Sequence, residues 1–312
     1  MNKKVLKTPL DYAIKAKMMG KKTISYSQIS TFANCPLRWK LEKIDRLGVV
    51  KPGIALIFGT AMHETIQSYL DVMYSETIVE ANKLDLRKML QDNMMDAFND
   101  FKKRSNSDMS AYTNKDEMRD FYEDGVAILE FFQKKRGQYF SKKHSELVGI
   151  EMPIFHQVEY NSKVMFMGFI DLVIKEGDKI KIIDIKTSYM GWRPNKKKQE
   201  GNQLRLYKKF FAEQYDVDIK DIEVEYFIIK RRLYEDMDFP QSRIQIYKPA
   251  SGKPSINKSD KLMRDFVDHC FDEDGKYKKD AEYLPYKTDC KYCQFKTNHE
   301  LCPPKQRLTR CA

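Results

Sequence analysis

Apolar and polar positions change their spacing along the chain, and three consecutive stretches in its middle have the pattern of β-strands. They are rich in β-branched and aromatic residues and are separated by turn residues, at Asn161-Ser162 and Gly177-Asp178. The predicted strands cover 146–160, 163–177 and 178–188, and two further strands are predicted at 221–233 and 242–249.

Helical spacing of apolar residues surrounds these strands. Single helices are predicted at 55–75, 202–215 and 258–271, and a pair of short helices at 23–44 with a break near Cys35-Pro36. Residues 80–138 have a strongly charged helical pattern that is interrupted around 104–114. The order of elements predicts an α/β fold, a mixed sheet flanked by helices with a helical block inserted before it.

The chain of 312 residues can form one large domain. We expect this domain at 23–303, with a helical block at about 76–140, a core with the sheet at about 146–250 and a cysteine-rich region at about 286–303. Outside it, a basic, exposed arm is expected at 1–22 and a tail at 304–312.

The composition is basic, with a formal net charge of +11. A basic surface favours polyanions, of which nucleic acid is the commonest. No apolar run approaches the roughly 20 residues of a membrane helix, and the N-terminus lacks the apolar core of a signal peptide. We therefore expect a cytoplasmic protein that is not secreted and has no membrane partner.

Asp184 and Lys186 stand two positions apart inside an apolar predicted strand. Side chains repeat with period two, so they share one face while Ile183 and Ile185 take the other. If the preceding strand pairs with this one, its lone acid Asp171 converges with Asp184, and two such carboxylates need a cation. Oxygen ligands suit Mg²⁺ or Mn²⁺, and the lysine could contact a phosphate. The alternative is an ordinary buried ion pair.

Three of the six cysteines form a close group near the C-terminus. Without a secretion signal we expect no disulfides, and the spacing in "CKYCQFKTNHELC" is that of metal ligands. A fourth thiolate could come from an upstream cysteine, and four thiolates suit either Zn²⁺ or an iron–sulfur cluster. The candidate ligands are Cys35, Cys290, Cys293 and Cys302.

Four short blocks occur in the order "FGTAMHETI", "GFIDLV", "IIDIKTS" and "QLRLY". With these blocks the chain resembles the PD-(D/E)XK nucleases, and within them the RecB/AddB-type exonuclease domain, including CRISPR-associated adaptation exonucleases and their phage relatives. The resemblance runs from about residue 23 to 303. It implies a restriction-endonuclease-like core, and a bacterial or phage-infected cell as the setting, with roles in DNA repair or recombination.

The resemblance also implies roles for the matching residues. His63, Asp171 and Asp184 are expected to be metal ligands, with the main-chain carbonyl of Ile185 completing the site, and Lys186 the catalytic lysine.

Gln203 and Tyr207, four apart on one helical face, are expected to position DNA near the metal. Glu151 also fits a family position, through a weaker motif. Taken alone, His63 and Tyr207 could also be packing residues of the core.

Nucleases to which this chain is similar carry one cysteine before the core and three after it, bound to a 4Fe–4S cluster. "FANCPLRW" matches their first-cysteine block, so the resemblance implies a cluster at Cys35, Cys290, Cys293 and Cys302 that ties the N-terminal helix to the C-terminal region. The spacing before Cys302 is longer than usual in the family, which leaves Cys311 as its alternative. Otherwise Cys270 and Cys311 are expected to be bystanders.

The sequence thus predicts a metal-dependent DNA exonuclease that acts on single-stranded ends. The alternatives are a structure-specific DNA endonuclease and a DNA-binding subunit with an inactive nuclease fold. Protein partners are not predicted.

Overall fold

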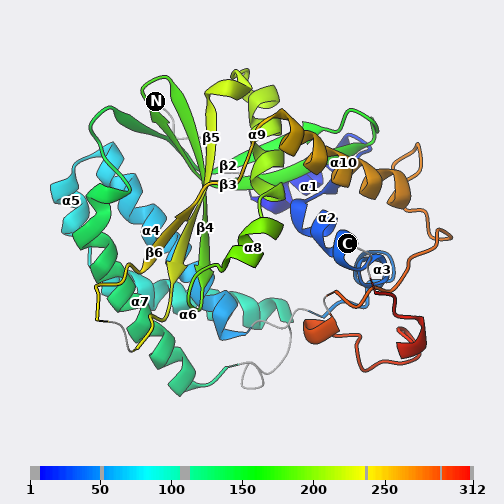
Figure 1. The fold of residues 1–312 in the computed structure, drawn as a ribbon, viewed down its shortest axis with the longest axis horizontal. Coiled ribbons are helices and arrows are strands. Elements are labelled where there is room, and N and C mark those ends of the chain that lie inside the picture. The colour runs from blue at the N-terminus through cyan, green and yellow to red at the C-terminus, as the bar shows by residue number, and fades with distance from the viewer. Residues whose placement is uncertain (1–7, 50–52, 106–112, 236–237, 289, 310–312) are drawn as a thin grey trace.

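The computed structural model describes residues 8–49, 53–105, 113–235, 238–288 and 290–309 (Figure 1). Among these residues a six-stranded sheet has the order β1-β3-β4-β5-β6, with β2 paired to β3. β2–β3, β3–β4 and β5–β6 are antiparallel, whereas β1–β3 and β4–β5 are parallel. The strands are β1 Lys22–Ile24, β2 Ser145–Gln157, β3 Val164–Glu176, β4 Lys179–Ser188, β5 Ile222–Lys230 and β6 Ile244–Tyr247. The prediction of a mixed sheet flanked by helices is confirmed.

Helices cover both faces of this sheet (Figure 1). On one face, alternate strand residues such as Ile183 and Ile185 pack against α4 and the helices that follow it. These helices are α4 Ile54–Ser75, α5 Ile78–Asn82, α6 Leu86–Ser105 and α7 Lys115–Lys135.

The opposite face packs Ile182, Tyr226 and Ile228 against a second layer of helices. They are α2 Tyr26–Asn34, α3 Pro36–Lys43, α9 Asn202–Tyr215 and α10 Lys253–Cys270. The remaining described helices are α1 Pro9–Met18 and α8 Pro194–Gln199, with short 3₁₀ turns at Arg136–Gln138, Ile219–Asp221, Cys290–Tyr292 and Pro304–Gln306. None of the described helices is long and apolar enough to cross a membrane.

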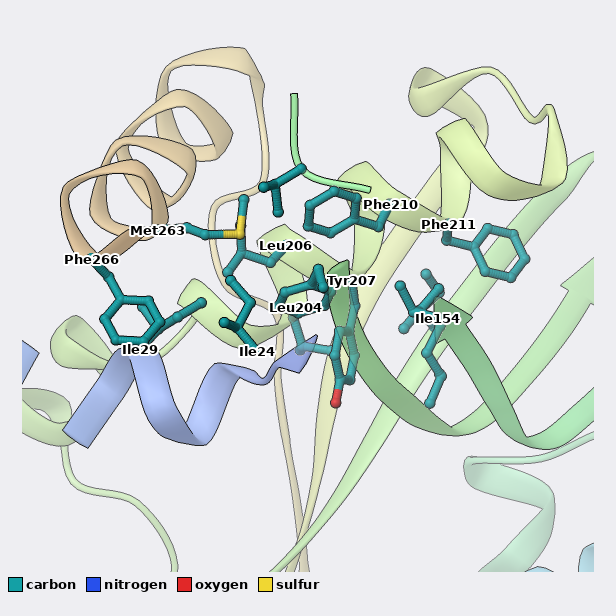
Figure 2. Packing of buried hydrophobic residues seen from close by; sticks show 14 of the residues in the cluster. Ile24, Ile29, Ile154, Leu204, Leu206, Tyr207, Phe210, Phe211, Met263 and Phe266 are labelled. Atoms are coloured by element: carbon teal, nitrogen blue, oxygen red, sulfur yellow. The ribbon is translucent and has the colours of Figure 1, made fainter. Parts of the chain in front are cut away.

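Helix α9 is held by a dense apolar cluster (Figure 2). Leu204 and Phe210 of α9 pack with Met263 and Phe266 of α10, and all four side chains are fully buried. Burial of each such side chain stabilises the fold by about 1.5–3 kcal/mol. Figure 2 shows the ring of Tyr207 within this cluster and its hydroxyl oxygen pointing out of it, so packing fixes where that hydroxyl lies.

The described part of the predicted arm at 1–22 contains helix α1. Thr8 caps α1, because its hydroxyl accepts from the Asp11 amide at 3.3 Å while the Asp11 carboxylate accepts from the Thr8 amide at 2.7 Å. Tyr12 packs its ring 5.3 Å from that of Phe155. Residues 22–24 then pair with β3.

Two other predicted segments can be placed in the structure. The described part of the expected tail at 304–312 packs back on the residues before it. The Leu308 amide donates to the Pro285 carbonyl at 2.8 Å. The predicted interruption at 104–114 falls between the end of α6 at Ser105 and the start of α7 at Lys115, and its residues 106–112 lie outside the described part.

Candidate active site

The two central strands of the sheet separate beside Asp171 and Asp184. β3 and β4 pair from Glu176 and Lys179 to Leu172 and Ile183, and the ladder stops there. Asp171 and Asp184 are the next residues on their strands. The Asp171 carboxylate Oδ2 accepts a hydrogen bond of 2.6 Å from the Ile185 amide, so a side chain replaces the neighbouring strand as the partner of that buried backbone group.

Asp184 and Lys186 form a close ion pair beside this gap. The Lys186 Nζ lies 2.5 Å from Asp184 Oδ2, and the Asp184 side chain is only 2% exposed. That oxygen is buried and accepts from the Lys186 ammonium. Burial by itself would lower the pKa of Lys186, but the charges of Asp184 and Asp171 raise it overall. The lysine is therefore held as a cation.

Carboxyl groups outnumber this one cation. Burial raises the pKa of Asp171 well above its usual value, and the Asp184 carboxylate raises it further. Burial also raises the pKa of Asp184 and of Glu151. Three carboxylates thus share one ammonium group, an arrangement that favours an additional cation.

Glu151 is the carboxylate that the sequence indicated least clearly. Ile150 pairs with Leu172 and Met152 with Ile170, which puts Glu151 opposite Asp171. Its φ of 48° is in the left-handed region that non-glycine residues rarely adopt. A charged residue inside an apolar strand and just before Met152-Pro153 was the available signal.

Helix α4 contributes His63 and Gln67 to the same place. The Gln67 amide donates to Glu151 Oε1 at 2.8 Å and to the Asp171 carbonyl at 3.1 Å. Because it lies four residues after His63, it shares that residue's helical face, and this spacing could have revealed it.

His63 Nδ1 lies 3.6 Å from Asp171 Oδ2. Burial first, and the charge of Lys186 second, lower the pKa of His63 to about 4. The imidazole is therefore neutral at pH 7, the form that can bind a metal ion. A Cβ on Gly59 would come 3.2 Å from the Thr187 hydroxyl, so the small residue lets α4 approach the end of β4 closely.

On the other side of the sheet, α9 presents Gln203 and Tyr207. The Gln203 amide donates to the Tyr207 hydroxyl at 3.2 Å. The ring of Tyr207 lies so close to β3 that a Cβ on Gly168 would be 2.7 Å from its Cε1 atom. Tyr207 is thus a core residue that also carries a polar group toward the site.

A cleft of about 660 Å³ adjoins these residues, lined by Gln203, Tyr207 and Lys186 and by hydroxyl side chains at the start of α2, including Ser25 and Ser27. Glu200 also lines it. Burial raises the pKa of Glu200, whereas the charges of Lys196 and Lys186 lower it. Sequence analysis did not identify Glu200, which lies three residues before Gln203.

The geometry joins the predicted metal ligands in pairs. Within the described residues, no three His, Cys, Asp or Glu side chains are close enough together to form a metal site. His63 faces Asp171, and Asp184 faces Lys186. The donor set nevertheless fits a hard divalent ion, because it offers carboxylate oxygens and a neutral imidazole.

Comparison with known proteins identifies the family. Residues 23–302 match the PD-(D/E)XK nuclease superfamily. The chain belongs to this superfamily. Nucleases of this superfamily generally use divalent metal ions. Membership of the superfamily implies that the substrate is DNA.

A solved structure of a "Putative exonuclease" from Eubacterium rectale is similar to the nuclease at 11% sequence identity and a TM-score of 0.45. The similarity covers 84% of this chain and 85% of that one. None of the curated proteins matches the chain.

The nuclease also gathers its four candidate cysteines. Each cysteine that the structure describes is free of a disulfide, and a cavity of about 10 Å³, about one water molecule in size, is lined by Cys35, Cys290, Cys293 and Cys302. Cys35 lies between α2 and α3, more than 250 residues before the other three.

Backbone contacts hold the two distant segments together at this cavity. The Tyr286 amide donates to Cys35 Sγ at 3.4 Å, and the Leu37 amide donates to the Leu284 carbonyl at 3.2 Å. Cys270 is buried elsewhere, in the cluster around α10, and Cys311 lies outside the described residues.

Proposed function

We propose that this nuclease is a metal-dependent DNA exonuclease that shortens DNA from single-stranded ends. The observation that carries the proposal is the meeting of Asp171, Asp184 and Glu151 around Lys186, where β3 and β4 separate. A bound Mg²⁺ or Mn²⁺ ion would activate water for attack on the phosphodiester. Its proposed ligands are His63, Asp171, Asp184 and the main-chain carbonyl of Ile185.

The chain's own groups have separate tasks in this proposal. Lys186 donates to a phosphate oxygen as negative charge develops there. The Gln203 amide and the Tyr207 hydroxyl orient the strand in the adjoining cleft, whose volume admits an unpaired strand. The basic surface guides DNA toward the cleft.

Digestion of end-labelled linear DNA, single-stranded or duplex, with Mg²⁺, Mn²⁺ or EDTA tests the activity. We expect single-stranded DNA to be shortened from an end only with a metal ion. Circular single-stranded DNA should stay intact. Cutting of the circle would indicate an endonuclease instead, and DNA binding without cleavage under any metal ion would indicate an inactive nuclease fold.

Two substitutions test the assigned residues. Asp184→Ala and Lys186→Ala should each lower the cleavage rate several hundredfold, because a lost transition-state contact costs about 3–4 kcal/mol. Lys179→Ala is the matched control. Lys179 lies at the other end of β4, pairs with Asp221 at 2.7 Å and is 49% exposed. Cleavage at the wild-type rate by Lys186→Ala would contradict the assignment.

We further propose that Cys35, Cys290, Cys293 and Cys302 bind a 4Fe–4S cluster with a structural role. The support is the convergence of these cysteines on one cavity. A cluster there would close a chain loop of more than 250 residues, and its binding free energy would also stabilise the fold.

Anaerobic purification tests the cluster. Wild-type protein should be brown and contain iron and acid-labile sulfide, whereas Cys35→Ser should lose both and unfold at a lower temperature. Cys270→Ser is the control, because Cys270 packs in a different cluster. Zinc in the wild-type protein would replace the iron–sulfur assignment, and normal iron content in Cys35→Ser would remove that residue from the ligands.

A further inference from the structure

Basic and aromatic side chains meet where the parallel strands β4 and β5 end. The Arg231 amide donates to the Ser188 carbonyl at 2.9 Å, and the Arg232 amide donates to the Tyr189 carbonyl at 2.7 Å. The two strand ends are therefore joined by their backbones. Lys186 lies on β4 and Tyr189 directly follows the end of that strand, three residues later, which is at most about 10 Å at the rise of a β-strand.

One arginine of this group is stacked between helix α7 and the end of the sheet. The Arg231 guanidinium lies 4.0 Å from the ring centroid of Phe121 and 5.1 Å from that of Tyr189. It also bonds to the Asp124 carboxylate at 2.7 Å. The Arg231 side chain is only 16% exposed, and its contacts hold α7 against the end of the sheet.

The neighbouring residue, Arg232, has no comparable structural role. Arg232 lies 3.2 Å from the same Asp124 oxygen with a side chain 48% exposed, so two arginines share one carboxylate. Arg243 adjoins them, since its guanidinium donates to the Arg231 carbonyl at 3.0 Å. Burial lowers the pKa of Arg243, the Asp124 carboxylate opposes this shift, and the charge of Arg232 adds to it. Positive charge is thus crowded here and a polyanion would relieve its repulsion.

An exposed ring completes the surface. Tyr189 is 61% exposed although it is a large aromatic residue, and Arg231 supports it at cation–π distance. Aromatic rings beside arginines are the elements that bind single-stranded nucleic acid, because bases stack on the rings and phosphates contact the guanidinium groups.

We infer that Tyr189, Arg232 and Arg243 form a second binding surface for single-stranded DNA, outside the cleavage site. This surface, the strand-end surface, deepens the proposed function and rests on it, because the strand that it holds is the one that passes Lys186. Tyr189 stacks on a base, and Arg232 contacts a phosphate. Holding the strand about 10 Å from Lys186 keeps the DNA bound between successive cuts.

Equilibrium binding of fluorescent oligo(dT) in EDTA tests the surface without cleavage. With an oligonucleotide of about 16 nucleotides, Tyr189→Ala should weaken binding about fivefold or more, whereas Tyr189→Phe, which keeps the ring, should stay close to wild type. Arg232→Ala should reduce the slope of log K against log salt by about 0.7, the value for one phosphate contact on a single strand.

Two controls separate this surface from general charge and from the cleavage site. Arg87→Ala removes another exposed arginine, 66% exposed and paired with Glu130 on the helical block, and should leave both affinity and slope unchanged. A single nucleotide, too short to span the roughly 10 Å between the two places, should bind far more weakly than the long oligonucleotide to every variant.

Several results would overturn the inference. If Tyr189→Ala and Arg232→Ala both bind the long oligonucleotide with wild-type affinity, the inference is wrong. That result would not contradict the proposed nuclease activity. Tighter binding of poly-L-glutamate than of oligo(dT), lost in Arg232→Ala alone, would identify an acidic protein as the partner instead. Loss of oligo(dT) affinity in a protein that cuts no DNA with any metal ion would support this surface and contradict the proposed activity.

Discussion

Replacing Gly168 with alanine should disable the candidate active site through its packing, without touching a charged group. The new Cβ would come 2.7 Å from Cε1 of Tyr207 and 3.0 Å from its hydroxyl oxygen, closer than any ordinary carbon contact. Gly168 does not have the positive φ of Gly177 or Gly201, so the substitution strains the contact rather than the backbone.

The size of the effect follows from how tightly the ring is held. Tyr207 is 6% exposed and belongs to the cluster around α9, so it cannot rotate into solvent. Excess volume in such a core costs about 1–3 kcal/mol. The ring must shift away from β3, which moves the hydroxyl that Gln203 contacts. A displacement of about 1 Å in a positioning group can lower the rate about a hundredfold.

Gly125→Ala provides a matched control. Its Cβ would come 2.5 Å from Leu90 on the opposite side of the sheet, far in sequence from α9. Urea unfolding should show similar destabilisation for both variants. Under conditions where both are folded, only Gly168→Ala should lose cleavage of labelled DNA. Equal activity of the two variants would refute the link between this packing and the site.

Further substitutions probe neighbouring contacts. Tyr207→Phe keeps the ring but removes the hydroxyl, and should lower the cleavage rate with a change in unfolding free energy of at most about 1.5 kcal/mol; unchanged cleavage would make Tyr207 a packing residue only. Gln67→Ala removes the donor to Glu151, and should raise the metal concentration needed for half-maximal cleavage, which a Mn²⁺ titration measures. Burial raises the pKa of Glu225 in the folded protein, so ionised Glu225 opposes folding at neutral pH. Glu225→Gln should therefore stabilise at pH 7, with the gain shrinking as pH falls toward the ordinary carboxyl pKa of about 4.3, and urea unfolding at both pH values checks this.

The sequence predicted the longer elements well because each has an unambiguous period. Alternate residues of strands β3 and β4 pack against the helices on opposite faces of the sheet. Helix α9 has 14 residues and helix α4 has 22, so each is long enough to show an apolar face. It did not predict α1, α8 or β1, which has only three residues. Such short segments have little periodicity, and contacts with distant residues stabilise them.

The site was predicted unevenly for a related reason. Asp171, Asp184 and Lys186 stand out as charges within apolar strands, so their positions carry a local signal. The local signals of Glu151 and Gln67 are weaker, and their roles depend on long-range geometry. The left-handed φ of Glu151 and the hydrogen bond from Gln67 follow from how β2 and α4 approach β3, and neither follows from local sequence patterns.

The separation of β3 and β4 decides whether the D-x-K motif is only an ion pair or part of a larger group of carboxyl groups. Asp184 and Lys186 alone would be a buried pair, and their 2.5 Å contact has that form. Had the ladder continued past Leu172 and Ile183, β3 backbone would occupy the place where Asp171 now accepts from the Ile185 amide. Because the strands separate there, a second carboxyl group, that of Asp171, can reach this place. More than one carboxyl group then lies beside the single ammonium group of Lys186. The break in the sheet is therefore the structural cause of the chemistry proposed for the site.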